Sequence, residues 1–165
     1  MRPSVNTRQV LRELSGGHPA DERRVWFSLA GPDLDPDAVT ALTDIRPSRS
    51  WRRGDPKPRT GLPYRDGAWL LESGLAASDE FHDHLDALIT RLKPSWSAFV
   101  ELGQRYEATV DVVICCREAQ GPLIQLLPDV AAALSDLGAT LSFDIYALPA
   151  DGDVGAPRMT FANTE

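Results

Sequence analysis

Several features that would identify a special class of protein are missing from this sequence of 165 residues. The cysteines are two neighbours, Cys115 and Cys116, which are too few for the disulfide framework of a small secreted domain. No stretch approaches the roughly 18 consecutive apolar residues of a membrane span, and the N-terminal segment lacks the apolar core of a signal peptide. We therefore expect a cytoplasmic protein built around one ordinary hydrophobic core.

Positive charge and catalytic motifs are scarce as well. The 24 acidic residues outnumber the 17 basic ones and leave a net charge of -7. Binding along a nucleic-acid backbone needs a positive surface, so nucleic acid is not expected as a general partner. The sequence has no phosphate-binding loop, no dinucleotide-binding glycine pattern, no hydrolase nucleophile elbow and no zinc-protease helix motif. We therefore predict no catalytic residue, no cofactor and no metal, and we favour a protein that is not an enzyme.

Apolar periodicity predicts a single α+β domain over residues 23–148. Alternation with a period of two predicts strands at 24–29, 47–53, 68–72, 108–116 and 140–146, with a further short strand at 123–126. Helical spacing predicts helices at 36–43, 79–93, 95–103 and 128–137. Outside the domain we expect an N-terminal extension over residues 1–22 with a short helix at 6–15, and a flexible tail over 149–165.

The capping residues and the hairpin refine this prediction. Asp35 before Pro36 is a good helix start, and Ser78 is the expected cap of the helix at 79–93. The strands at 47–53 and 68–72 are joined by a loop rich in proline and glycine, which indicates antiparallel pairing. The predicted fold is a two-layer sandwich, a mostly antiparallel sheet with helices packed on one face.

Four stretches give the chain a resemblance to a known bacterial family. They are GPDLDPDAVT, GAWLLES, HLDALITRLKP and LGATLSFDIY, at residues 31–40, 67–73, 84–94 and 137–146. In this order and spacing they resemble the family catalogued as domain of unknown function 4279. The resemblance covers residues 24–147 and implies a compact α+β fold. It brings no established activity and no catalytic residue.

Residues that often carry chemistry are better explained here as structural. His82 and His84 lie about 200° apart on the predicted helix, so their imidazoles do not converge on a metal. Cys115 and Cys116 point to opposite faces of their strand, where buried thiols are common and inert. Asp111 and Asp144 are able to meet across strands on the face opposite the core, either as two solvated acids or as an acid–base pair.

The most unusual local composition is the stretch at residues 46–59, RPSRSWRRGDPKPR. It contains six basic residues and one acid, a local charge of +5 in a chain of -7. Arginines in this number are suited to contacts with carboxylates or phosphates. The alternative is a solvated hairpin whose charges protect a sheet edge from aggregation.

The sheet face opposite the core is predicted to be unusually aromatic. By strand parity we place on it Trp26, Ser28, Trp69, Leu71, Asp111, Val113, Ser142, Asp144 and Tyr146. Trp51, on the hairpin partner of Trp69, has no fixed register at this stage. Either another element covers this face, such as the N-terminal helix, or the face binds a partner.

We therefore predict a non-enzymatic binding module that holds a protein partner or a second copy of itself, with an immunity-type protein that neutralises a toxin as one concrete form. The predicted binding residues are Trp26, Trp51, Arg52, Arg53, Trp69, Asp111, Asp144 and Tyr146. The alternative is a small-ligand-binding domain or enzyme with a pocket on the same face, using Asp111, Asp144 and Arg53. A nucleic-acid binder acting through the basic hairpin ranks third.

Overall fold

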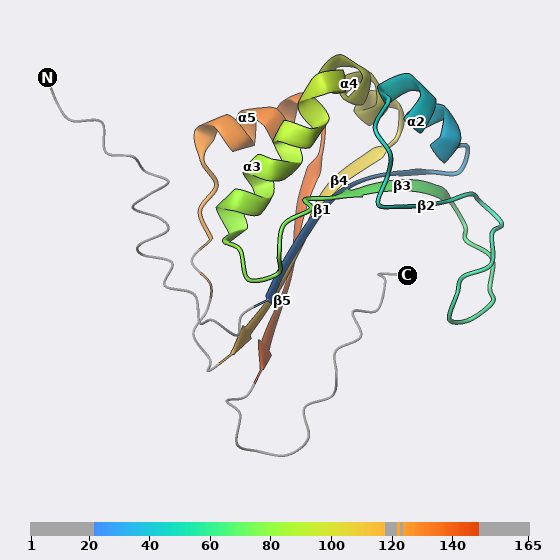
Figure 1. Cartoon of the computed structure of the whole chain (residues 1–165). Coiled ribbons are helices and arrows are strands. Elements are labelled where there is room, and N and C mark those ends of the chain that lie inside the picture. Colours follow the sequence, from blue (N-terminus) through green and yellow to red (C-terminus); the bar gives the residue numbers. More distant parts are fainter. Residues whose placement is uncertain (1–21, 118–121, 123, 149–165) are drawn as a thin grey trace, which may run out of the picture.

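The computed structural model describes residues 22–117, 122 and 124–148 (Figure 1). The helix predicted at 6–15 and the tail predicted at 149–165 lie outside these residues. In chain order the elements are β1 (Glu22–Gly31), α2 (Pro36–Thr43), β2 (Arg49–Trp51), β3 (Gly67–Glu72), α3 (Phe81–Leu92), η1 (Lys93–Ser95), α4 (Trp96–Arg105), β4 (Glu107–Arg117), α5 (Pro128–Asp136) and β5 (Thr140–Leu148).

The strands form one five-stranded sheet in the order β2-β3-β1-β4-β5. Every neighbouring pair is antiparallel except β4 and β5, which are parallel and are connected through α5. The helices all lie on one side of the sheet, with α3 over β1 and α2 over β3 (Figure 1). The predicted α+β fold, a mostly antiparallel sheet with helices on one face, is confirmed.

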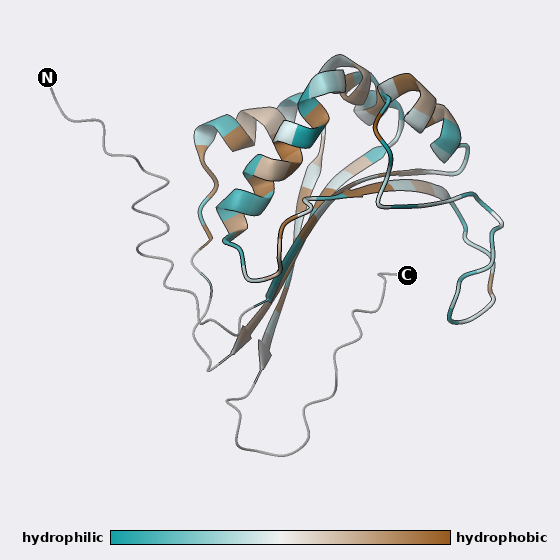
Figure 2. Cartoon of the chain, viewed as in Figure 1, coloured by the Kyte–Doolittle hydropathy of each residue, from teal (hydrophilic) through white to brown (hydrophobic). Residues whose placement is uncertain are grey.

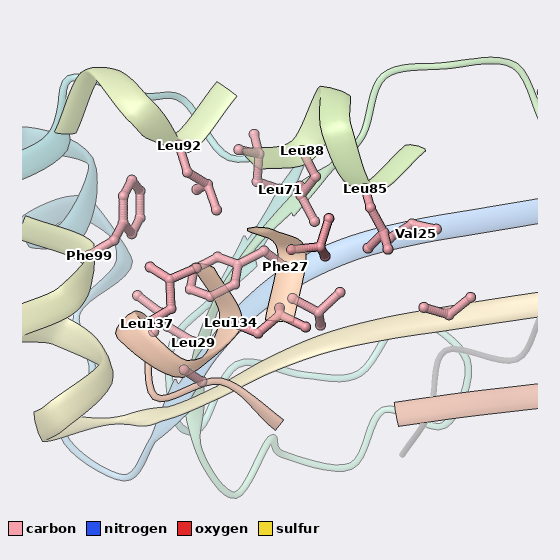
Figure 3. Packing of buried hydrophobic residues seen from close by; sticks show 14 of the residues in the cluster. Val25, Phe27, Leu29, Leu71, Leu85, Leu88, Leu92, Phe99, Leu134 and Leu137 are labelled. Carbon is pink, nitrogen blue, oxygen red and sulfur yellow. The ribbon is translucent and has the colours of Figure 1, made fainter. Parts of the chain in front are cut away.

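The core lies between that face and the helices. Alternation in β1 turns Val25, Phe27 and Leu29 toward the helices, and all three side chains are buried. Apolar residues of α3 and α4 meet them from above, including Leu85, Leu88, Leu92 and Phe99, and Leu134 and Leu137 close the α5 end (Figure 3). Colouring by hydropathy shows the same division, with hydrophobic positions along the strands and hydrophilic ones on the outer sides of the helices (Figure 2).

Two helix starts were predicted from capping residues, and one of them is right. Asp35 caps α2, because its side chain accepts a hydrogen bond from the Asp37 N–H at 3.1 Å. The prediction that Ser78 caps the next helix is wrong, since α3 begins at Phe81 after Glu80. Asp79 instead closes a tight turn by accepting from the Ala76 N–H at 2.9 Å. That turn delays the helix by two residues.

The strand predicted at 123–126 is also wrong for the residues described there. Residues 124–126 form no regular secondary structure and pair with no described strand. The carbonyl of Gln125 is instead bonded by His82 Nε2 at 2.8 Å. Ile124 and Leu127 still pack against the core, which explains the apolar pattern that suggested a strand.

A close approach of backbones fixes α4 against the end of α5. A side-chain carbon added at Gly103 would lie 2.0 Å from the carbonyl oxygen of Leu137. Only a residue without such a carbon fits there. The contact holds the crossover that leads into β5.

Candidate binding face

The sheet face turned away from the helices, which we call the open face, is defined by strand register. Residues directly opposite each other in a ladder share a face, and two cross-strand rows describe it. One row is Trp51, Ala68, Ala30 and Glu107, and the other is Glu72, Trp26, Asp111 and Ser142. Among the described residues no helix lies on this side (Figure 1). The register therefore places Trp26, Trp51, Asp111, Asp144 and Tyr146 on the open face, as predicted for all of these except Trp51, whose register the sequence left undecided.

Asp111 occupies the middle of the open face and is only partly accessible to solvent. The Ser28 hydroxyl donates to its Oδ2 at 3.4 Å, and the indole of Trp26, its partner across the ladder, lies beside the carboxyl. Burial raises the pKa of the Asp111 carboxyl above its usual value, and the charges of Asp144 and Glu107 act in the same direction. The polar groups of Ser28 and Trp26 lower the pKa of Asp111 but do not cancel this shift.

No basic side chain within 4 Å forms an ion pair with Asp111 or Asp144 in the part of the chain that the structure describes. The two carboxylates lie on adjacent strands, two residues apart in register, since Asp111 is opposite Ser142 and Asp144 is opposite Val113. The open face therefore brings two carboxylates close to the indole of Trp26, with one basic residue, Arg24, opposite Val113 on the same face. A group of this kind favours a cation, and a guanidinium can also stack on the indole.

A second aromatic group lies at the corner where β2 meets its loop. The rings of Trp51 and Tyr64 are stacked, with centroids 4.4 Å apart and an angle of 17° between planes. Lys57 Nζ lies 5.7 Å from the centre of the Tyr64 ring. From Trp51 to Asp111 the register spans three strand spacings and four residues, a separation of about 20 Å at the usual sheet dimensions. The corner and the centre of the open face are thus separate groups.

The prediction that Trp69 lies on this face with Arg52 and Arg53 is wrong. Trp69 is opposite Leu29 and has no exposed surface, because it points among the helices, where its indole donates to Thr40 Oγ1 at 3.1 Å. Leu71 is buried on the same side, so its placement on the open face is also wrong. Arg52 is tied to the start of α2 through ion pairs with Asp35 and Asp37.

Arg53 is exposed and has no ion pair within the described residues. It follows β2 near the Trp51 corner, so it is remote from Asp111. The pocket imagined from Asp111, Asp144 and Arg53 is therefore not assembled on the open face.

Comparison with known proteins identifies the chain at the level of its family. A family model described as "Domain of unknown function (DUF4279)" matches residues 21–148. The chain belongs to this family. The match takes in every strand and helix of the described structure. No curated protein and no solved structure matches the chain.

The histidines of the DUF4279 domain are built into its core. His82 bonds the Gln125 carbonyl, as described above, and the Nδ1 of His84 lies 2.6 Å from the Ser73 hydroxyl. Ser73 and His84 are both buried, so this pair has no route to a substrate. Burial lowers the pKa of His84, and its Nε2 has no hydrogen-bond partner among the residues that the structure describes. No three His, Cys, Asp or Glu side chains gather to hold a metal in the parts of the chain described.

A hollow of about 730 Å³ lies on the helix side of the DUF4279 domain, between α3 and α5. Ile89, Val130 and Trp96 contribute apolar surface to it, and Asp86 and Asp136 contribute carboxylates. It was not predicted from the sequence, because its lining residues come from helices that are far apart in the chain and meet only in the folded structure. None of the described helices is both long enough and apolar enough to cross a membrane.

Proposed function

We propose that this DUF4279 domain is a non-enzymatic protein-binding module whose open face takes a basic segment of a partner protein. The observation that carries the proposal is the environment of Asp111. A half-buried carboxylate with two acidic neighbours and no ion pair to any described residue is unfavourable in the isolated protein. A guanidinium or ammonium group from a partner relieves that cost.

The surroundings of Asp111 support a protein as the partner. Trp26 lies beside the carboxylate, and Tyr146 is exposed further along the same face. Aromatic residues of this kind are typical anchors of protein interfaces. The net charge of -7 attracts a basic partner over a distance and raises the rate of encounter. Neutralisation of a basic toxin by an immunity-type protein is one function of this class.

The first prediction concerns Asp111→Asn. This change keeps the size of the side chain and its hydrogen-bonding oxygen while removing the charge. We expect displayed random peptides selected on the native protein to be enriched in arginine and lysine, and the same peptides to bind Asp111→Asn at least tenfold more weakly, about 1.4 kcal/mol. The free variant should be more resistant to heat at neutral pH, because the ionised carboxyl is the form that burial penalises.

The matched control is Glu101→Gln, which removes one acid from the exposed side of α4. It changes the net charge equally and should leave peptide binding nearly unaltered. If both variants weaken binding to the same extent, the attraction comes from bulk charge and the open face is not the site. Selection of acidic or purely apolar peptides would also contradict the proposal.

The second candidate function is binding of a small ligand, and the hollow between α3 and α5 is the observation that favours it. Its volume is within the usual range for ligand sites. Its lining has one basic residue, Lys93, against three aspartates and the ring of Trp96, a combination suited to a small organic cation. Ligand-dependent shifts of Trp96 fluorescence, absent from an Asp136→Lys variant, would support this function over the first.

A further inference from the structure

The two edges of the sheet are protected very differently. β2 is an edge strand of only three residues, it carries Arg49, and the arginines Arg52 and Arg53 follow it. Short edge strands and positive charge discourage pairing with another chain. β5, at the other edge, is nine residues long and reads TLSFDIYAL. It has one charged residue, Asp144, and no proline, lysine or arginine to block pairing.

The β5 edge is also apolar on both faces at one end. Ile145 lies on the helix face with 49% of its surface exposed, and Tyr146 lies on the open face with 43% exposed. They are neighbours in the chain and two of the few large hydrophobic side chains exposed in the described structure. At this end β4 and β5 run past the helices, so no described helix shields either side of the strand (Figure 1).

We propose that the chain forms a two-fold symmetric dimer in which β5 pairs antiparallel with β5 of a second copy. This surface is distinct from the centre of the open face, so the inference goes beyond the proposed function. A two-fold axis perpendicular to the sheet joins the two sheets edge to edge and keeps both sets of helices on the same side. The backbone N–H and C=O groups that β5 leaves on its outer edge then bond each other.

The sequence of β5 is compatible with itself in this arrangement. Residues directly opposite each other in an antiparallel pair lie on the same face of the sheet. In a symmetric pair of β5 strands, the two-fold axis must therefore pass beside one residue, which lies opposite the same residue of the second copy. An axis at Asp144 would place two carboxylates opposite each other, which is unfavourable. An axis at Phe143 instead sets Ser142 opposite the second copy's Asp144, and Leu141 opposite its Ile145. The first pair can share a hydrogen bond, and the second covers the exposed isoleucine.

The test compares Ile145→Lys with Leu42→Lys in the full-length protein. Both replace an exposed apolar residue by the same charge, but Leu42 lies on α2, at the other end of the sheet, with 59% of its surface exposed. We expect sedimentation equilibrium to show a reversible dimer of the native protein and of Leu42→Lys. Ile145→Lys should dissociate at least tenfold more readily. Circular dichroism should be the same for all three proteins.

A second measurement fixes the geometry. With Ser142→Cys and Asp144→Cys together, a short thiol cross-linker should join two copies, and each single variant should join them much less efficiently. A native protein that is monomeric at every concentration would overturn the proposal. A dimer that Ile145→Lys does not weaken, or one that the double variant fails to cross-link, would do the same. Dissociation by Trp26→Ala with no effect of Ile145→Lys would move the contact to the open face.

Discussion

At the scale of single residues, the two tryptophans of the β2–β3 hairpin lie on opposite faces of the sheet and differ in burial. Trp69 is enclosed between the sheet and the helices, where its ring centre is 5.5 Å from that of Phe99. Trp51, from the adjacent strand, points to the other face and stacks on Tyr64. One ring is part of the core and the other belongs to an accessible surface.

This contrast makes a quantitative prediction. Trp69→Ala should lower the free energy of unfolding by about 3–5 kcal/mol, the usual loss for a large buried ring. Trp51→Ala should cost about 1 kcal/mol, since it removes a stacking contact from a half-exposed position. Chemical denaturation of both variants measures the difference. Equal losses would mean that Trp69 is less enclosed than the structure shows.

At the scale of elements, the junction of α4 with α5 depends on one glycine. Gly103→Ala should destabilise the domain by about 1–3 kcal/mol, because the added carbon collides with the Leu137 backbone and the helices must separate. Gln104→Ala, at the next and exposed position of α4, is the control and should have little effect. Thermal unfolding of the two variants compares them directly. A stable Gly103→Ala protein would show that the two helices are not held at this distance.

Elements were also the scale at which the sequence was most informative. Period-two alternation in β1 and β4 fixed both the strands and their inward faces, and the apolar stripe of α3 located that helix. β3 was different, since its residues from Gly67 to Leu71 are all buried and the strand has no polar face. Without alternation of apolar and polar residues, the sequence of β3 does not show which side chains face the helices. For this reason Trp69 was predicted on the open face, although it lies on the helix face.

The candidate site was predictable only in part, for a related reason. The parity of β1 and β4 was enough to place Trp26 and Asp111 on the same face. Their separation from Trp51 depends on strand order, because β3 and β1 lie between β2 and β4. Strand order depends on tertiary packing and on which strands pair, and the alternation of apolar residues within one strand predicts neither. The ion pairs of Arg52 with the start of α2 also required the folded structure.

At the scale of the whole molecule, stability should depend on pH through His84. Its pKa is lowered chiefly by burial, with Arg23 acting in the same direction and Asp79 in the opposite one. As the pH falls through about 6.5, His84 of the unfolded chain is protonated while His84 of the folded protein is still neutral. Above that pH His84 does not lower the free energy of unfolding. The free energy of unfolding decreases as the pH falls from about 6.5 toward the lower pKa that His84 has in the folded state. The slope is at most about 1.4 kcal/mol per pH unit for one proton.

A variant of His84 and a control variant without any change of ionisable groups check this prediction. His84→Asn should flatten the loss of stability between neutral and mildly acidic pH, whatever it does to stability at neutral pH. Gln104→Ala, which alters no ionisable group at an exposed position of α4, should leave the slope as it is in the native protein. Denaturation midpoints measured across this range give the slopes. An unchanged slope in His84→Asn would assign the pH dependence to other groups.

The parallel pairing of β4 with β5 has a consequence for synthesis. Two parallel strands must be joined by a crossover, and here the crossover contains α5. The chain is made from its N-terminus, so β5 leaves the ribosome only after β4 and α5. Until then β4 has no partner on that side, and it contains the apolar run Val112, Val113 and Ile114. An unpaired strand of this composition readily associates with other chains. The interval between translation of β4 and of β5 is therefore when the nascent protein is most exposed to aggregation, and when a chaperone has most to protect.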